Sequence, residues 1–178
     1  MIDYLSLKKY LPENFNELSK VWIYQSSRLL TMSEALSIES LLENFINQWQ
    51  SHGAPVKGFA NLIFGQFIII MADETQTAVG GCSTDSSVKL IKQIEQEFKL
   101  DFLNRQNLAF IIKDKIQILP MQQLNYALEN EFINAETLYF NNTVTSKKDL
   151  ENNWIIPIKK SWLSNRYNLT QQTSNSLN

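Results

Sequence analysis

The stretch that decides the fold is KGFANLIFGQFIIIMA, residues 57–72. Two runs rich in β-branched and aromatic residues, 57–64 and 66–72, flank Gly65, and this pattern predicts two strands joined by a tight hairpin. The second run contains Phe67-Ile68-Ile69-Ile70-Met71, which is apolar at every position. Strands buried on both faces have this composition, so we expect residues 67–71 to form the central strand of a sheet.

The residues before this hairpin predict a strand and a long helix. The run Val21-Trp22-Ile23-Tyr24 has the composition of a buried strand. Thr31 and Glu34 have the spacing of a capping box, in which each side chain accepts a hydrogen bond from the other residue's backbone N–H. The apolar residues that follow recur at helical spacing and predict an amphipathic helix ending near Gly53 and Pro55: Ile38, Leu41, Leu42, Phe45, Ile46 and Trp49.

The residues after the hairpin predict a second helix and a further strand. We interpret residues 80–87 as a loop, with Asp85 or an adjacent serine capping a helix whose apolar stripe contains Val88, Ile91, Ile94 and Phe98. Residues 107–112 are typical of a strand. The order from residue 21 to residue 112 is therefore strand, helix, strand, strand, helix, strand. This order predicts an α+β protein with a ferredoxin-like βαββαβ core, an antiparallel sheet with both helices on one face.

The remaining residues are expected to extend and wrap this core. Residues 115–119 form a hairpin with 107–112, and a third helix begins at Pro120 and ends near Asn130. Residues 138–140 are expected to form a strand and residues 146–153 a short helix, while the aromatic segment Trp154–Leu163 covers the open face of the sheet. We expect a helical extension at residues 1–19, a single domain at 20–163 and a disordered tail at 164–178.

Composition and charge restrict the class of protein. The formal net charge is −2 and no lysine- or arginine-rich block occurs, which argues against a nucleic-acid partner. No apolar run approaches the length of a membrane span, and the first residues lack the pattern of a signal peptide, so we expect a cytoplasmic protein without a membrane partner. The single cysteine excludes an internal disulfide, and neither a metal site nor a cofactor is expected.

The segment from Gly80 to Ser87 is the strongest candidate for a binding site. Two glycines and several hydroxyls at the start of a helix favour an anion, because first-turn N–H groups lack partners and the helix dipole attracts negative charge. The same residues also fit an ordinary structural turn, and the chain has no GxxxxGK[ST] phosphate loop. The candidate ligand-binding residues are Gly80, Gly81, Cys82, Ser83, Thr84, Asp85 and Ser86.

The predicted topology places His52, Asp73 and Cys82 at one end of the fold. A nucleophilic cysteine needs thiolate character, which a helix N-terminus or a neighbouring imidazolium favours. Cys82 as nucleophile, His52 as base, and Asp73 or Asp85 as orienting group would make a cysteine-dependent enzyme or redox protein. The opposing interpretation is that the cysteine packs in the core and the histidine caps a helix C-terminus.

Two further interpretations concern the aromatic residues. A stacking platform for single-stranded RNA would form if the following aromatic residues were exposed on the open sheet face: Trp22, Trp49, Trp154 and Trp162, with Tyr139 and Phe140. The basic and glycine residues that accompany such platforms are missing around Trp22. If the cover of the sheet is incomplete, a homodimer through the sheet face is the expected outcome.

Several segments resemble a small family of uncharacterised bacterial proteins that are often labelled ABC transporter ATPases. The resemblance lies in residues 21–26, 49–53, 81–87, 141–144 and 153–154, and it extends over residues 20 to 163. It implies a stand-alone soluble bacterial protein. The label itself does not fit, because the chain has no phosphate loop and no Leu-Ser-Gly-Gly-Gln signature.

Taken together, the sequence favours a non-enzymatic module that binds a small anionic ligand or a partner protein at the end around residues 81–87. The first alternative is the enzyme that uses Cys82 with His52. The second is a structural homodimer subunit that binds no ligand.

Overall fold

The computed structural model describes residues 4–167, which divide into two compact units. The N-terminal unit contains residues 5–104 and 142–152. The C-terminal unit contains residue 4 with residues 105–141 and 153–167. The sequence predicts a single domain over residues 20–163, whereas the contacts within the chain divide this range between the two units. The predicted tail lies outside the described residues from 168 onward.

The N-terminal unit is built on a three-stranded antiparallel sheet. Its strands are β1 (Lys20–Gln25), β4 (Lys57–Ile63) and β5 (Phe67–Asp73), in the order β1-β5-β4. Every residue of β5 is buried, which confirms the predicted central strand. At the hairpin, the Gln66 N–H donates to the Ile63 carbonyl at 3.2 Å, and Phe64 and Gly65 have φ values of 55° and 62°. Turns with two positive φ values match the twist of the strands that they join.

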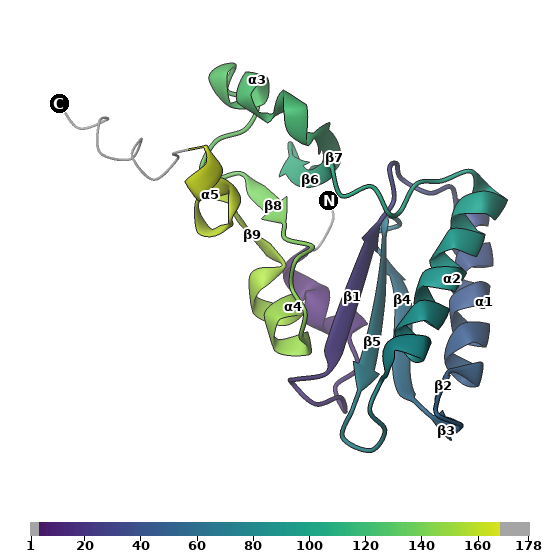
Figure 1. Cartoon of the computed structure of the whole chain (residues 1–178). Helices are drawn as coiled ribbons and strands as arrows, with labels where there is room; N and C mark the ends of the chain where they lie inside the picture. The colour runs from purple at the N-terminus through teal and green to yellow at the C-terminus, as the bar shows by residue number, and fades with distance from the viewer. Residues whose placement is uncertain (1–3, 168–178) are drawn as a thin grey trace. The chain divides into compact units, whose positions relative to one another are not determined.

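Two helices cover one face of this sheet, as Figure 1 shows: α1 (Met32–Gln48) and α2 (Gly81–Phe98). The predicted capping box is present at the start of α1, and Glu34 also accepts two hydrogen bonds from Arg28, at 2.7 and 2.9 Å. These bonds lower the pKa of Glu34 to about 2. The core beneath the helices includes five residues that are at most 1% exposed: Ile38, Leu42, Ile70, Ile91 and Ile94.

The opposite face of the sheet is covered by the 3-10 helix η1 (Tyr4–Tyr10), the residues that follow it, and α4 (Lys147–Asn153). The Phe15 ring meets the Phe59 ring edge-on at 6.4 Å, and the Lys147 N–H donates to the Ser19 carbonyl at 2.9 Å. The sequence predicts that residues 154–163 cover this face, or that a homodimer forms there if the cover is incomplete. It is covered instead by the unit's own residues, because the chain before β1 folds back over it.

The C-terminal unit has a four-stranded antiparallel sheet of its own. Its strands are β6 (Asn107–Ile112), β7 (Lys115–Pro120), β8 (Leu138–Phe140) and β9 (Ile155–Pro157), in the order β7-β6-β8-β9. The helical elements are η2 (Met121–Gln123), α3 (Leu124–Glu129), η3 (Ile158–Lys160) and α5 (Leu163–Arg166). The segment that begins at Trp154, expected to cover the first sheet, thus contributes an edge strand to the second.

The α+β class agrees with the prediction, but the fourth strand of the expected βαββαβ sheet lies elsewhere. Strand β6 pairs with β7 on one side and β8 on the other, so neither of its edges is free to extend the first sheet. The outer edge of β1 meets a different segment: Lys20 forms a bridge with Ser146, and the Val21 N–H donates to the Thr145 carbonyl at 3.0 Å. In residues 4–167 no helix is both long and apolar enough to cross a membrane.

Candidate functional site

Helix α2 begins earlier than the sequence predicted. It starts at Gly81, with Gly80 as an extended N-cap, so residues 81–87 form two helical turns instead of a loop. Asp85 therefore lies exposed within the helix and does not cap it. The serine and threonine hydroxyls fit into a helix here because they donate to backbone carbonyls. The bonds run from Thr84 to Gly80, from Ser86 to Cys82 and from Ser87 to Thr84, at 3.3, 2.9 and 2.7 Å.

These hydrogen bonds limit what the start of α2 offers to an anion. The Ser83 hydroxyl also donates to a carbonyl, that of Gln50, at 3.1 Å. The hydroxyls of Ser83, Thr84 and Ser86 are thus engaged as donors and are not free to donate to a ligand. The first N–H groups of α2 have no acceptor within the helix, and a Cβ added at Gly81 would meet no atom within 4 Å. An anion at this position would depend on the backbone alone.

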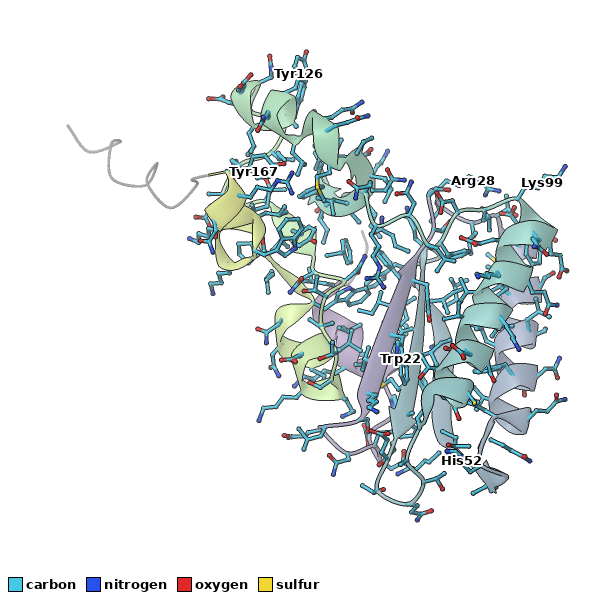
Figure 2. All side chains as sticks on the ribbon, in the orientation of Figure 1. Trp22, Arg28, His52, Lys99, Tyr126 and Tyr167 are labelled. Atoms are coloured by element: carbon cyan, nitrogen blue, oxygen red, sulfur yellow. The ribbon has the colours of Figure 1, made fainter. Side chains whose placement is uncertain are left out.

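The start of α2 is joined to the end of α1. The Trp49 indole Nε1–H donates to the Ser83 carbonyl at 3.0 Å, and the Ser51 hydroxyl donates to the Ala78 carbonyl at 2.7 Å. His52 lies in the turn between the short strands β2 (Gln50–Ser51) and β3 (Ala54–Pro55). Its Nε2 atom would be 3.2 Å from a Cβ built on Gly80. The structure therefore brings His52 to the start of α2, the end at which Figure 2 labels it.

Asp73 does not join this cluster. Its neighbour Ala72 packs under the helices, so Asp73, the next residue of β5, faces the opposite side of the sheet. Its side chain is buried and accepts hydrogen bonds from the Lys57 Nζ at 2.7 Å, the Thr75 N–H at 3.1 Å and the Asn16 N–H at 3.2 Å. Burial opposes ionisation, but these hydrogen bonds outweigh it and hold the pKa of Asp73 well below its usual value. Asp73 is thus a structural carboxylate.

Cys82 is exposed in the first turn of α2. Among the interactions described for residues 4–167, none joins the Cys82 thiol to the His52 ring. We expect iodoacetamide to alkylate Cys82 in the folded protein, and His52→Ala to change the rate by less than about twofold between pH 5 and 9. Mass spectrometry of timed samples measures both rates. A tenfold slower reaction in the His52→Ala variant would instead support the nucleophile–base pair.

The tryptophans do not form a stacking platform. Trp22 and Trp49 meet edge-on at 6.2 Å on the helix side of the first sheet. Trp154 is completely buried and packs against Phe140 in the C-terminal unit. Trp162 donates from Nε1 to the Tyr139 hydroxyl at 3.3 Å. A platform for single-stranded RNA requires exposed rings on one surface. Trp22 and Trp49 instead pack in the N-terminal unit, while Trp154 and Trp162 contact residues of the C-terminal unit.

The C-terminal unit contains a cavity that the sequence did not reveal. It has a volume of about 820 Å³ and lies between the β6–β7 hairpin and the residues of α3 and the turn that follows. Lys113, Lys115 and Gln117 line it from the hairpin. Tyr126, Glu131 and Phe132 line it from the other side. Cavities of this size with a mainly apolar lining and few polar groups are typical of small-molecule sites.

Two aromatic rings give this cavity its character. Tyr126 is 63% exposed and Phe132 is 60% exposed, and their ring centroids lie 6.2 Å apart. Figure 2 labels Tyr126 on α3. Leu124 and Ala127 of the same helix are buried, whereas Tyr126 is exposed. An aromatic residue outside the buried positions Leu124 and Ala127 of α3 is the feature of the sequence that points to this cavity.

The charged groups of the cavity are mostly cationic. Lys113 belongs to the turn of the β6–β7 hairpin and Lys115 begins β7, while Glu131 is the one carboxylate in the lining. Within residues 4–167, neither lysine takes part in an ion pair. Both ammonium groups are therefore available to an anionic group at the mouth of the cavity.

No cluster of three or more His, Cys, Asp or Glu side chains suited to a metal ion occurs within residues 4–167. The lining of the cavity offers apolar surface, side-chain amides, two ammonium groups and the Glu131 carboxylate. Comparison of the chain with protein-family models, curated proteins and solved structures gives no match.

Proposed function

We propose that this chain is a binding protein that holds a small amphipathic anion in the cavity of its C-terminal unit. The observation that carries the proposal is a cavity of about 820 Å³ in which an exposed Tyr126–Phe132 pair faces a hairpin bearing Lys113 and Lys115. The rings offer contact area to an apolar or aromatic body, and the lysines attract a carboxylate, sulfonate or phosphate.

The exposure of the two rings supports this assignment. Large aromatic side chains bury much apolar area when they are covered, so two adjacent exposed rings at a cavity mark a surface that gains free energy from a ligand. The lysines contribute orientation more than affinity, since exposed ion pairs are worth about 0.2–1 kcal/mol each. The ligand is therefore expected to be held mainly by its apolar part.

The start of α2 stays a prediction of the same function class, the binding of a small anion. Its support is the set of first-turn N–H groups beside Gly81 and the open space there. It lacks hydroxyl donors for a ligand, because those of Ser83, Thr84 and Ser86 already donate to carbonyls. Mapping a bound anion by NMR distinguishes this position from the cavity.

A matched pair of dyes tests the proposal. 1-Anilinonaphthalene-8-sulfonate and N-phenyl-1-naphthylamine share an aromatic body, and only the first carries a negative charge. We expect both to bind the folded protein, with amide shifts in residues 112–132. Tyr126→Ala should weaken both about tenfold, whereas Lys113→Gln/Lys115→Gln should weaken only the sulfonate, by about threefold to tenfold.

The control is Lys89→Gln/Lys92→Gln, which removes the same charge from exposed positions on α2. Fluorescence titration gives the dissociation constants. Equal binding by the control, the lysine variant and the tyrosine variant would refute the cavity as the site. Amide shifts confined to residues 80–87 would move the site to the start of α2.

A further inference from the structure

We propose that the groove between α1 and β4 binds an extended segment of a partner protein in which two basic residues flank one other residue. The segment would add as a strand to the free edge of β4. This surface belongs to the N-terminal unit and is separate from the cavity proposed above.

The free edge of β4 is the first observation. Strand β4 ends the sheet of order β1-β5-β4, and no strand of the described chain pairs with its outer side. Over its seven residues, alternate N–H and C=O groups point away from β5. Strand addition is a recurring mode of peptide recognition in which such edge groups supply main-chain hydrogen bonds. The outer edge of β4 can therefore form main-chain hydrogen bonds with an added strand.

The groove beside this edge is the second observation. A cavity of about 450 Å³ lies between α1 and β4, and a Cβ built on Gly58 of β4 would be 3.2 Å from Cδ1 of Ile46 in α1. Leu42 and Ile46 form the apolar floor on the helix side, and residues 58–61 form the strand side. A strand added to β4 would place every second side chain into this groove. The groove therefore selects side chains while the edge binds the backbone.

The negative charge of the groove indicates that the bound segment is basic. Glu39 and Glu43 line the groove, both are exposed, and neither takes part in an ion pair within residues 4–167. Helix α1 contains no lysine or arginine. Residues four apart on a helix have Cβ atoms about 5–6 Å apart. Side chains two apart on a strand are separated by about 6.6 Å. A basic residue at every second position thus matches the two carboxylates.

The same charges argue against a second copy of this chain. Antiparallel pairing of β4 with β4 about a two-fold axis would place both α1 helices on the same face of the joined sheet. Four carboxylates, two from each Glu39 and Glu43 pair, would then meet across the interface. Like charges at an edge are a common means by which proteins avoid pairing with themselves. The groove is therefore suited to a basic partner.

The probe is the hexapeptide acetyl-Thr-Lys-Val-Lys-Val-Thr-amide carrying a fluorophore, titrated with the full chain at low salt. We expect saturable binding with a Kd below about 1 mM, and amide shifts confined to residues 39–47 and 57–63. The same peptide with glutamate in place of lysine should not bind. Absence of binding by the lysine peptide would overturn the proposal.

Two variants and two modified peptides test the separate parts. Glu39→Gln/Glu43→Gln should weaken binding about fivefold to tenfold and reduce its salt dependence, while the charge-matched Glu13→Gln/Glu97→Gln control should not. Peptides N-methylated on alternate residues distinguish the two edges of the bound strand. One methylated set should lose at least tenfold in affinity and the other little. Equal effects of both sets would exclude strand addition.

Discussion

Trp49→Ala is expected to lower the free energy of unfolding of the N-terminal unit by about 3–5 kcal/mol, the usual cost of removing a buried tryptophan. Trp49 is 4% exposed. Its ring centroid lies 5.1 Å from that of Phe45 and 6.2 Å from that of Trp22. It lies so close to β4 that a Cβ at Gly58 would be 2.7 Å from Cε3 of the indole. Its removal leaves a cavity at the point where both helices and the sheet meet.

Trp49→Phe is the matched variant for the hydrogen bond. It keeps an aromatic ring in the core but leaves the buried Ser83 carbonyl without the indole donor, so we expect a loss of about 1–3 kcal/mol. Urea unfolding followed by circular dichroism measures both losses. A loss below 1 kcal/mol for Trp49→Ala would contradict the central role of this ring. Hydrogen exchange should also show faster opening at residues 80–84, because Trp49 holds the start of α2.

Local signals in the sequence predicted helix α1 and the β4–β5 hairpin of the N-terminal unit. The Thr31–Glu34 box and the apolar spacing behind it defined α1, since both depend only on residues close in the chain. The positive-φ turn at Gly65 and the apolar run after it defined the β4–β5 hairpin. These features do not depend on how distant segments meet.

The pairing between strands that are distant in the chain was harder to predict from the sequence. Strand β6 has a strand-like composition, but nothing in residues 107–112 specifies whether it pairs with β1 or with β8. The outcome depends on residues 142–146, which occupy the edge of β1 through the Lys20–Ser146 bridge and a hydrogen bond from Asn142 to Gln25 at 2.8 Å. This segment contains the β-branched residues Thr143, Val144 and Thr145, but it is short and nothing in it specifies pairing with the distant strand β1. The ferredoxin-like order was therefore the simpler prediction.

The candidate sites were likewise predictable only in the features that depend on the order and direction of the elements. Topology placed His52 beside the start of α2, because it depends only on the directions of neighbouring elements. The roles of Ser83, Thr84 and Ser86 depended on where their hydroxyls donate, which composition does not specify. The cavity near Tyr126 joins residues from a hairpin and a helix that are separate in the chain. Its aromatic and cationic residues form a candidate binding site only once the fold brings them together.

Asp73→Asn is expected to lower the free energy of unfolding at pH 7 by about 2–4 kcal/mol, as expected for a lost buried charge that accepts several hydrogen bonds. The carboxylate accepts from three donors, Lys57, Thr75 and Asn16. An amide has only one acceptor oxygen, and its NH₂ group would face a donor. Lys57 is partly exposed, so its ammonium group regains some hydration and the expected loss stays below that of a fully buried pair.

The pH dependence of this loss gives a stricter test, because the pKa of Asp73 is lower in the folded than in the unfolded protein. A carboxyl group with a depressed folded-state pKa contributes its full stability above its unfolded pKa, about 3.9 for aspartate, and loses it as the pH falls toward the folded value. The difference between wild type and Asp73→Asn should thus be constant from pH 7 to pH 5 and shrink below about pH 4. Urea unfolding at pH 7, 5, 3.5 and 2.5 measures it, and a difference that stays constant down to pH 2.5 would show that the charge of Asp73 is not the cause of its effect.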